Sequence, residues 1–223
     1  WLRAFALSTL GGATDQYGGA GSQHNVQFYV RPSDGRVLHF PHDLDFSSSS
    51  HMPVVGNNDL ARLLQDPDHE RAYYAHLNDI LAQSYDADYL APWCAQLGAL
   101  LPGQPFDAHC AFVADRAAWV RSGSGDAVEA RFPPVSFDIT TNGGDDLSVA
   151  ADEDVLEGEG WIDIASVGRR GFDESLPFSW VGDDTWEVVV PLSEGDNDVW
   201  LEALDRHGER VGSDQIGVER TGG

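Results

Sequence analysis

The spacing of apolar residues changes near residues 122–125, and this change constrains the fold more than any other feature. Before it, apolar residues recur every three to four positions, as in Trp93, Leu97 and Leu100. After it, they alternate with polar residues over short runs such as 186–190. The intervening Ser-Gly-Ser-Gly is typical of a flexible joint. We therefore predict an α+β protein with domains at residues 1–121 and 135–223, joined by a linker at residues 122–134.

Acidic charge supports the same division. The formal net charge is −24, and every basic residue is Arg. From residue 135 onward, 22 Asp and Glu face 5 Arg, whereas residues 1–134 hold 15 and 8. Such a surface repels nucleic acid and anionic lipid and suits cation binding or solubility in salty surroundings. We therefore expect no nucleic-acid partner, and no stretch is long and apolar enough to cross a bilayer.

In the first domain we expect two strands and several helices whose apolar stripes form the core. The stripe of the helix after Asp86 would comprise Leu90, Trp93, Leu97, Leu100 and Leu101. The two cysteines, Cys94 and Cys110, fit either one disulfide or two buried thiols on facing helices. The expected helices are 1–10, 59–64 with Asn58 as cap, one after Asp68, one after Asp86 and one after Pro105; the expected strands are 25–31 and 37–40.

The second domain alternates like an all-β protein. About seven short strands separated by Gly- and Asp-rich turns predict an Ig-like β-sandwich. We expect its tryptophans to be core residues rather than a sugar-binding platform; they are Trp161, Trp180, Trp186 and Trp200. The expected strands are 135–140, 147–150, 161–167, 177–180, 186–190, 199–204 and 215–219.

The segment VLHFPHDLDFSSSS, residues 37–50, holds a candidate metal site. If it is a strand, alternation places His39, Asp43 and Asp45 on one face and His42 on the other. Two carboxylates on one face repel each other unless a cation or strong donors lie between them, and hard cations prefer oxygen ligands. The alternative is a strand that ends in a solvated acidic turn.

Three ordered segments resemble a known family. TDQYGGAGSQHN (14–25), a strand–turn–strand and FPHDLDF (40–46) resemble the C-terminal half of the CotH-type kinases, the secreted and spore-coat atypical kinases. In that family an Asp lies in a segment like TDGY, an Asn precedes an aromatic strand, and a Pro-Trp-Asp-x-Asp segment follows. Residues 59–121 look like the helical C-terminal lobe of that family, and residues 135–223 look like an Ig-like module that often follows it.

The resemblance implies a metal-dependent protein kinase. Asp15 matches the catalytic Asp, Asn25 the metal-binding Asn, and Asp43 the metal-binding Asp, with Asp45 as a further ligand or support. Phosphoryl transfer requires these roles, since an Asp orients the acceptor hydroxyl and an Asn and an Asp hold the metal. The implied cofactor is ATP with Mg²⁺ or another divalent cation. The implied partners are protein substrates or surface and coat proteins, in an extracellular or cell-surface location.

The chain departs from the family pattern in several ways. His42 stands where the family has Trp, the segment between Asp15 and Asn25 is longer, and no lysine is present to contact phosphate. Since Trp1 lies inside an expected helix, we interpret the chain as part of a longer protein whose nucleotide-binding lobe precedes it. We expect this chain alone to be inactive; nucleotide hydrolysis or protein phosphorylation by it would contradict that expectation.

Two other functions compete with the kinase. The first is a non-catalytic surface or coat protein with a degenerate kinase fold, whose acidic sandwich turns bind Ca²⁺ weakly. The second is a transition-metal hydrolase centre built from His39, His42, Asp43 and His51. Strand alternation disfavours the second, because it places His39 and His42 on opposite faces.

Overall fold

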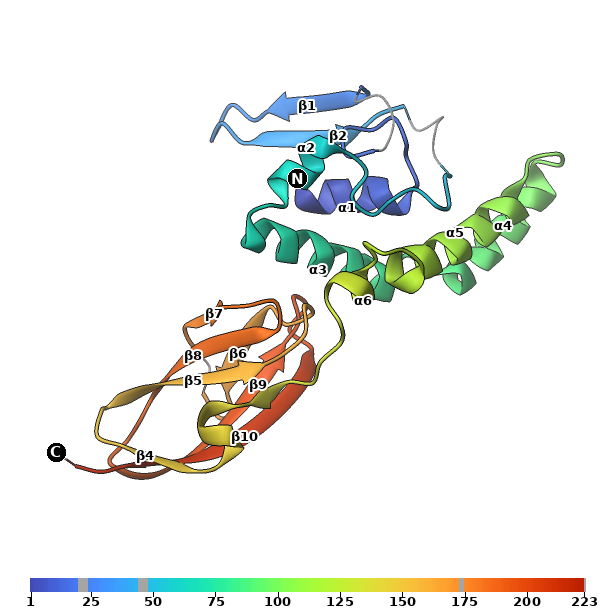
Figure 1. Ribbon diagram of the computed structural model, residues 1–223. Helices are drawn as coiled ribbons and strands as arrows, with labels where there is room; N and C mark the ends of the chain where they lie inside the picture. The colour runs from blue at the N-terminus through green and yellow to red at the C-terminus, as the bar shows by residue number, and fades with distance from the viewer. Residues whose placement is uncertain (20–23, 44–47, 173–174, 223) are drawn as a thin grey trace. The chain divides into compact units, whose positions relative to one another are not determined.

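The chain folds into two compact units, Trp1–Arg131 and Phe132–Gly223, in a computed structural model (Figure 1). The structure describes residues 1–19, 24–43, 48–172 and 175–222. Helices and strands both contribute, as the predicted α+β class requires, and the strands of the second unit form a sandwich. None of the described helices is both long and apolar enough to cross a membrane.

The first unit combines a two-stranded sheet with a set of helices. Strands β1 and β2 pair antiparallel, with Val26 opposite Pro41 and Val30 opposite Val37. The other elements are helical, and the last long helix continues into a π-helical turn. The elements are α1 (Leu2–Leu10), β1 (Val26–Val30), β2 (Val37–Pro41), α2 (Asn58–Leu63), α3 (Pro67–Gln83), α4 (Ala87–Leu100), α5 (Phe106–Ala118), a π-helical turn (Trp119–Gly123) and α6 (Val128–Arg131).

Helices α1 and α3 build the core of this unit. Tyr73, Leu77 and Ile80 of α3 are buried, as are Phe5 and Leu10 of α1. The predicted helical stripe of α3 is therefore a core face. The N-caps lie slightly earlier than predicted: the side chain of Asp66 caps α3 and that of Asn57 caps α2, each accepting two backbone N–H groups.

A buried arginine ties α5 to the rest of the first unit. Arg116 is fully buried, and its guanidinium donates only to backbone carbonyls in the contacts described. Its Nε and Nη2 donate to Thr9 O at 3.0 and 2.7 Å, and its Nη1 donates to Ser50 O at 3.1 Å and Met52 O at 2.5 Å. A cation at the C-terminal end of α1 also complements the helix dipole.

Helices α4 and α5 form a hairpin that extends from the first unit (Figure 1). A disulfide between Cys94 and Cys110 joins them, which decides between the two alternatives for the cysteines. The prediction that the α4 stripe is a core face is wrong: none of the fourteen described residues of α4 is buried. The stripe has helical spacing, but the helix that packs against α4 is α5, and most of the α4 surface faces solvent.

The predicted linker is largely folded structure. Its middle part, residues 124–131, belongs to the first unit, where Ala127 and Val128 are buried. Asp126 O accepts a hydrogen bond from Tyr74 Oη at 3.0 Å, and Asp126 Oδ2 accepts one from Val55 N at 3.0 Å. The Ser-Gly composition indicated flexibility, but these apolar and hydrogen-bonded neighbours hold the segment against α3. The boundary between the units therefore falls between residues 131 and 132.

The second unit is a sandwich of two four-stranded sheets, ordered β4-β10-β9-β6 and β3-β5-β8-β7. All pairs are antiparallel except β4 with β10. Of the strand predicted over residues 161–167, only residues 166 and 167 are strand, and residues 161–165 form an irregular segment with a turn. Strand β5 was not predicted, because acids and a glycine surround its apolar residues. The strands are β3 (Asp138–Ile139), β4 (Leu147–Val149), β5 (Glu153–Glu159), β6 (Ser166–Arg169), β7 (Phe178–Trp180), β8 (Thr185–Pro191), β9 (Gly195–Leu204) and β10 (Arg210–Arg220).

Trp186 is the centre of the sandwich core. It is completely buried, stacks on Phe137 with ring centroids 4.9 Å apart, and donates from Nε1 to Glu159 O at 2.7 Å. A Cβ at Gly158 would collide with its ring, so β5 needs glycine there. The prediction of core tryptophans is wrong for Trp200, which is 36% exposed and lies under the Arg170 guanidinium.

Candidate functional site

The β1–β2 hairpin places two of the predicted site residues at one end. Since Val26 pairs with Pro41, Asn25 and Asp43 lie just beyond the paired ends of the two strands. The third residue, Asp15, comes from the loop that follows α1. The fold therefore brings the loop after α1 to the end of the hairpin, and the residues predicted from the ordered segments meet there.

A short hydrogen bond joins Asp15 to Asn25. Asn25 Nδ2 donates to Asp15 Oδ2 at 2.6 Å, and the same nitrogen lies 3.4 Å from Asp43 O. Asp15 is only 7% exposed, whereas Asp43 is exposed. The site therefore has a buried carboxylate that Asn25 orients, close to the backbone carbonyl of an exposed residue, Asp43.

Gln16 binds the backbone of residues 42 and 43. It is buried, and its Nε2 donates to His42 O at 2.6 Å and to Asp43 O at 3.1 Å. Sequence reasoning missed this residue. The only available signal was its place directly after Asp15, because nothing in a single glutamine predicts that its amide faces inward.

Asn57 fixes the other end of the Asp15 loop. Its Oδ1 accepts from the first amides of α2, and its Nδ2 donates to Tyr17 O at 2.7 Å and Gly19 O at 2.8 Å. One side chain thus caps a helix and holds the loop. Sequence reasoning named the neighbouring Asn58 as the cap and missed the contact with the loop.

The backbone at Asn25 and Asp43 differs from the extended strand predicted. Both residues have positive φ, 57° and 56° respectively, a conformation in which Asn and Asp are the commonest non-glycine residues. Because β2 ends at Pro41, strand alternation does not continue to Asp43, and the prediction that His39 and Asp43 share a strand face is wrong. Asp45 lies outside the described residues, so its predicted role is not tested.

The oxygen atoms at the site fit a hard cation. Asp15 Oδ1 and Gln16 Oε1 are buried and have no hydrogen-bond partner among the described residues. An unpaired buried carboxylate oxygen is costly unless a cation or donor reaches it. No group of three His, Cys, Asp or Glu side chains suited to a metal occurs in the described part of the chain. A metal here would therefore depend on the Asn25 amide oxygen and the Asp43 carboxylate, which are oxygen donors of the kind Mg²⁺ uses.

The histidines pack against aromatic rings. The His39 ring lies 5.4 Å from Trp1 and 6.2 Å from Phe5, and the His51 ring lies 4.5 Å from Trp119. Burial, with a smaller contribution from the N-terminal amino group, lowers the pKa of His39 below its usual value. Neither histidine belongs to a group of three His, Cys, Asp or Glu side chains suited to a metal among the described residues, so these residues do not support the hydrolase centre.

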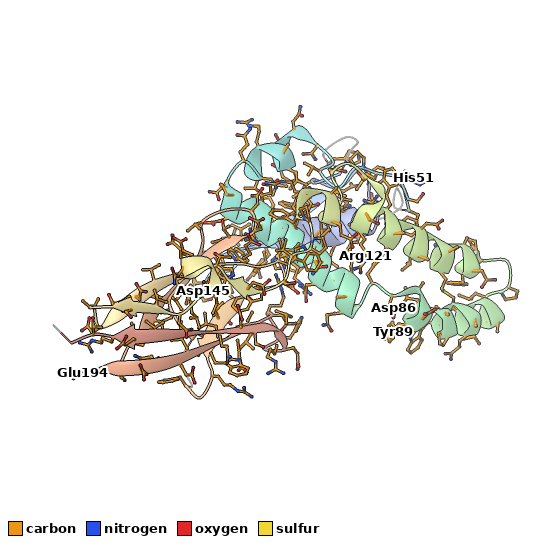
Figure 2. All side chains as sticks on the ribbon, turned by 60° about the horizontal axis from the view of Figure 1, so that its bottom comes forward. His51, Asp86, Tyr89, Arg121, Asp145 and Glu194 are labelled. Carbon is orange, nitrogen blue, oxygen red and sulfur yellow. A yellow bond between two sulfur atoms is a disulfide. The ribbon has the colours of Figure 1, made fainter. Side chains whose placement is uncertain are left out.

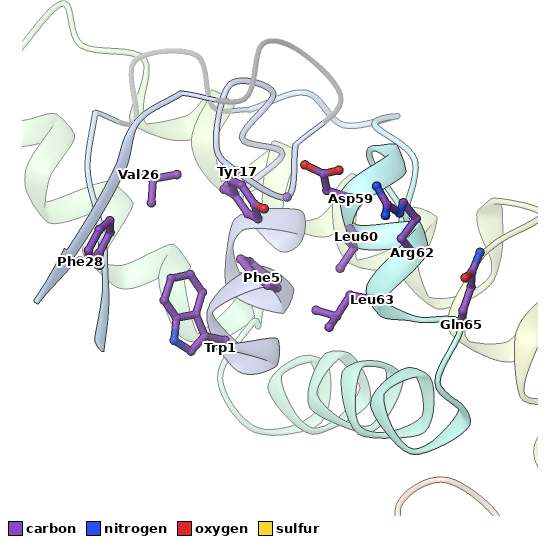
Figure 3. Close-up of a pocket in the computed structure, with 11 residues that line it drawn as sticks. Trp1, Phe5, Tyr17, Val26, Phe28, Asp59, Leu60, Arg62, Leu63 and Gln65 are labelled. Carbon is purple, nitrogen blue, oxygen red and sulfur yellow. The ribbon is translucent and has the colours of Figure 1, made fainter. Parts of the chain in front are cut away.

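An aromatic pocket adjoins the Asp15 loop (Figure 3). It has a volume of about 890 Å³, and its walls include Trp1, Phe5, Tyr17 and Phe28. Asp59 and Arg62 of α2 also line it, as Figure 3 shows. Tyr17 lies two residues after Asp15, so the pocket and the site share a loop. Its walls suit an apolar or planar group.

Comparisons with known proteins identify no family. No family model matches the chain, and no curated protein matches it. One matching solved structure contains the fibronectin(III)-like modules of Clostridium thermocellum CbhA. The match has 15% sequence identity and a TM-score of 0.27, and it covers 39% of this chain and 96% of the other. No functional conclusion follows from a likeness at this level.

Proposed function

We propose that the first unit carries a divalent-cation site for phosphoryl transfer to protein hydroxyl groups, as the resemblance to CotH-type kinases implies. The observation that carries this proposal is the 2.6 Å hydrogen bond between Asn25 and Asp15, next to the Asp43 carbonyl. The matched residues come from separate segments of the chain and meet at one place.

In this proposal Asp15 is the catalytic base. Asn25 holds Oδ2 of its carboxylate, and Oδ1 is the oxygen left for an acceptor hydroxyl. The hydroxyl oxygen bonds to the transferred phosphorus, its proton passes to Asp15, and the nucleoside diphosphate leaves. The Asn25 amide oxygen and the Asp43 carboxylate would hold a divalent cation, which supplies positive charge that neutralises the phosphates.

Gln16 and Asn57 would support this arrangement without contacting the substrate. Gln16 links the Asp15 loop to the Asp43 segment, and Asn57 links the same loop to α2. Reacting groups must be held within a fraction of an ångström, so residues that position Asp15 and Asp43 are needed for the reaction as well as those that contact the substrate.

Metal titration tests the proposal on the chain as it stands. We expect Mn²⁺, used as a probe, to bind the chain by calorimetry, and Asp43→Asn to weaken that binding at least about tenfold because it removes a charged oxygen ligand. Asp107→Asn, which removes an acid in the first turn of α5, is the matched control and should bind normally. Equal Mn²⁺ affinity in the wild type and Asp43→Asn would contradict the proposed site.

Phosphate transfer tests the reaction itself. In a complete protein that carries this chain, Asp43→Ala should abolish metal-dependent phosphorylation with little loss of fold. Asp15→Asn should lower kcat by about 10²–10⁴-fold, the usual contribution of a positioned base. An undiminished rate in Asp43→Ala would end the kinase proposal.

The alternative is a non-catalytic surface protein with a calcium-binding sandwich. Its acidic turns do not supply a group of three carboxylates around one position in the described residues. Millimolar Ca²⁺ titrated into Asp43→Asn distinguishes the two, because that variant lacks the first-unit site. Heat release would favour the alternative, and its absence would remove the calcium part of it.

A further inference from the structure

Helix α4 depends on α5 for its place in the fold. None of the fourteen described residues of α4 is buried, and the helix that packs against it is α5. Helix α5 is itself anchored, because Val113 and Arg116 are buried and Nε of Arg116 donates to Thr9 O at 3.0 Å. The two halves of the hairpin are therefore unequal: α5 contributes to the core of the first unit, whereas α4 lies outside that core.

The sequence of α4 does not favour a stable helix on its own. Pro92 lies inside the helix, where a proline has no N–H to donate to the carbonyl one turn earlier, and glycine, as at Gly98, has the lowest helix propensity after proline. Isolated helices shorter than about 12–15 residues are marginal in water even when they are rich in alanine. Asp86 caps the start of α4 by accepting from Asp88 N at 2.8 Å, and Figure 2 labels Asp86 and Tyr89 at that end, but a cap acts only on the first turn.

A covalent link compensates for this weakness. The disulfide between Cys94 and Cys110 joins the middle of α4 to α5, and the two cysteines are 16 positions apart in the sequence. In the chain-entropy account, closing a loop of this length disfavours its unfolded state on the order of 100-fold. Both cysteines are half-buried between exposed neighbours, so a small dithiol can reach the sulfur atoms.

We propose that the Cys94–Cys110 disulfide is a redox switch for the order of α4. A dithiol reductant breaks the S–S bond by thiol–disulfide exchange: it gives two electrons and two protons to the sulfur atoms and itself becomes a disulfide, which leaves two cysteine thiols. Without the link, α4 and the connection at residues 101–105 unfold, while α5 stays in place through Val113 and Arg116. The hairpin is then complete only in oxidising surroundings. The proposal does not rest on phosphoryl transfer.

Hydrogen–deuterium exchange of the air-oxidised chain, followed by mass spectrometry, tests this proposal. Dithiothreitol should speed amide exchange at residues 88–104 at least about tenfold, because the open state of this segment regains the freedom that the link removes. Exchange at residues 113–118 of α5 and in β9 should not change. The double variant Cys94→Ser with Cys110→Ser should exchange like the reduced chain, with or without dithiothreitol, which separates loss of the link from other effects of the reagent.

Two further variants serve as a control and as a test of the helix itself. Ala95→Ser with Ala111→Ser changes an exposed neighbour of each cysteine and keeps the disulfide, so it should match the wild type in both redox states. Pro92→Ala restores a backbone donor inside α4, so in the reduced state it should slow exchange at residues 88–104 at least about tenfold relative to the reduced wild type. An unchanged rate in Pro92→Ala would contradict the weakness assigned to this helix.

Three results would overturn the proposal. A free-thiol assay that finds two thiols in the air-oxidised chain would show that the link does not form. Equal exchange at residues 88–104 in the oxidised and reduced chains would show that α4 keeps its order without the link. A loss of protection that extends to residues 113–118 would show that the link supports the whole first unit rather than α4.

Discussion

Similar apolar patterns are buried to different extents in the two units. In the second unit, β9 alternates along its length, and Val199, Leu201 and Ala203 are all completely buried between the two sheets. In the first unit, the β1–β2 hairpin leaves Phe28 61% and Phe40 47% exposed. A periodic pattern identifies the apolar face of an element, but burial also needs a second layer to cover that face. The sandwich supplies that layer for every long strand, whereas a two-stranded sheet and a helical hairpin supply it only in part.

The largest expected effect comes from comparing a fully buried residue of the second unit with an exposed residue of the first. Trp186→Ala should destabilise the second unit by about 3–5 kcal/mol, the usual range for emptying an aromatic core site. Leu100→Ala, at a residue with 68% exposure, should change the free energy of unfolding of the monomer by less than about 0.5 kcal/mol.

Urea unfolding of dilute protein, followed by circular dichroism, measures both variants. If Leu100→Ala costs as much as Trp186→Ala, the α4 stripe is buried within one chain, and the contrast between the units disappears.

An intermediate effect concerns the polar core of the first unit. Arg116→Met preserves much of the side-chain volume but removes the guanidinium hydrogen bonds to Thr9 O, Ser50 O and Met52 O. We expect a loss of about 3 kcal/mol, because hydrogen bonds to a charged group contribute about 1.5–3 kcal/mol, while Thr9 O and Met52 O each keep one other donor.

The same urea titration measures this loss, which should fall on the first unit alone. Arg121→Met, in the π-helical turn, is the control and should cost less than about 0.5 kcal/mol. A loss shared by both units would show that they do not unfold independently.

The smallest effect uses the tyrosines, all six of which lie in the first unit. Burial raises the pKa of Tyr85 to about 12 and raises those of Tyr73 and Tyr74 further. Their hydroxyls donate to backbone carbonyls, as Tyr85 does to Leu10 O at 2.6 Å. An acid whose pKa is raised on folding stabilises the fold below its unfolded pKa, near 10, and that contribution is lost as pH rises through the folded pKa.

The first unit should therefore unfold between about pH 10 and 12 while the second keeps its sheets. Tyr85→Phe should cost about 1 kcal/mol at neutral pH and move the alkaline midpoint upward, because one ionisation is removed. Far-ultraviolet circular dichroism across this pH range gives the midpoint, with Tyr89→Phe as the exposed control. A sandwich that unfolds first would contradict the expected order.

The elements that could be predicted from sequence were those with a strong local pattern. The long α3, the hairpin strands and most sandwich strands follow from periodicity and turn residues, because those signals are local. Strand β5 could not be predicted, since its single buried apolar residue, Leu156, is surrounded by acids and glycines. The exposure of α4 could not be predicted either, because a helical pattern does not indicate whether another element covers the apolar face.

The candidate site was predictable in part. The order of Asp15, Asn25 and Asp43 along the chain led to the expectation of one site, and the structure places them together. Their conformations were not predictable, because Asp43 has a positive φ and the carbonyls of residues 42 and 43 accept hydrogen bonds from the distant Gln16. The partners of these two hydrogen bonds are separated by 26 and 27 positions in the sequence, and no local pattern predicts such a contact.

The supports of the site are all carboxamides: Gln16, Asn25 and Asn57. A carboxamide does not titrate at any pH that a folded protein survives, so the framework that holds the Asp15 loop, the hairpin end and the start of α2 is indifferent to proton concentration. The donors of this scaffold are therefore the same in acidic and in alkaline solution, for as long as the chain stays folded.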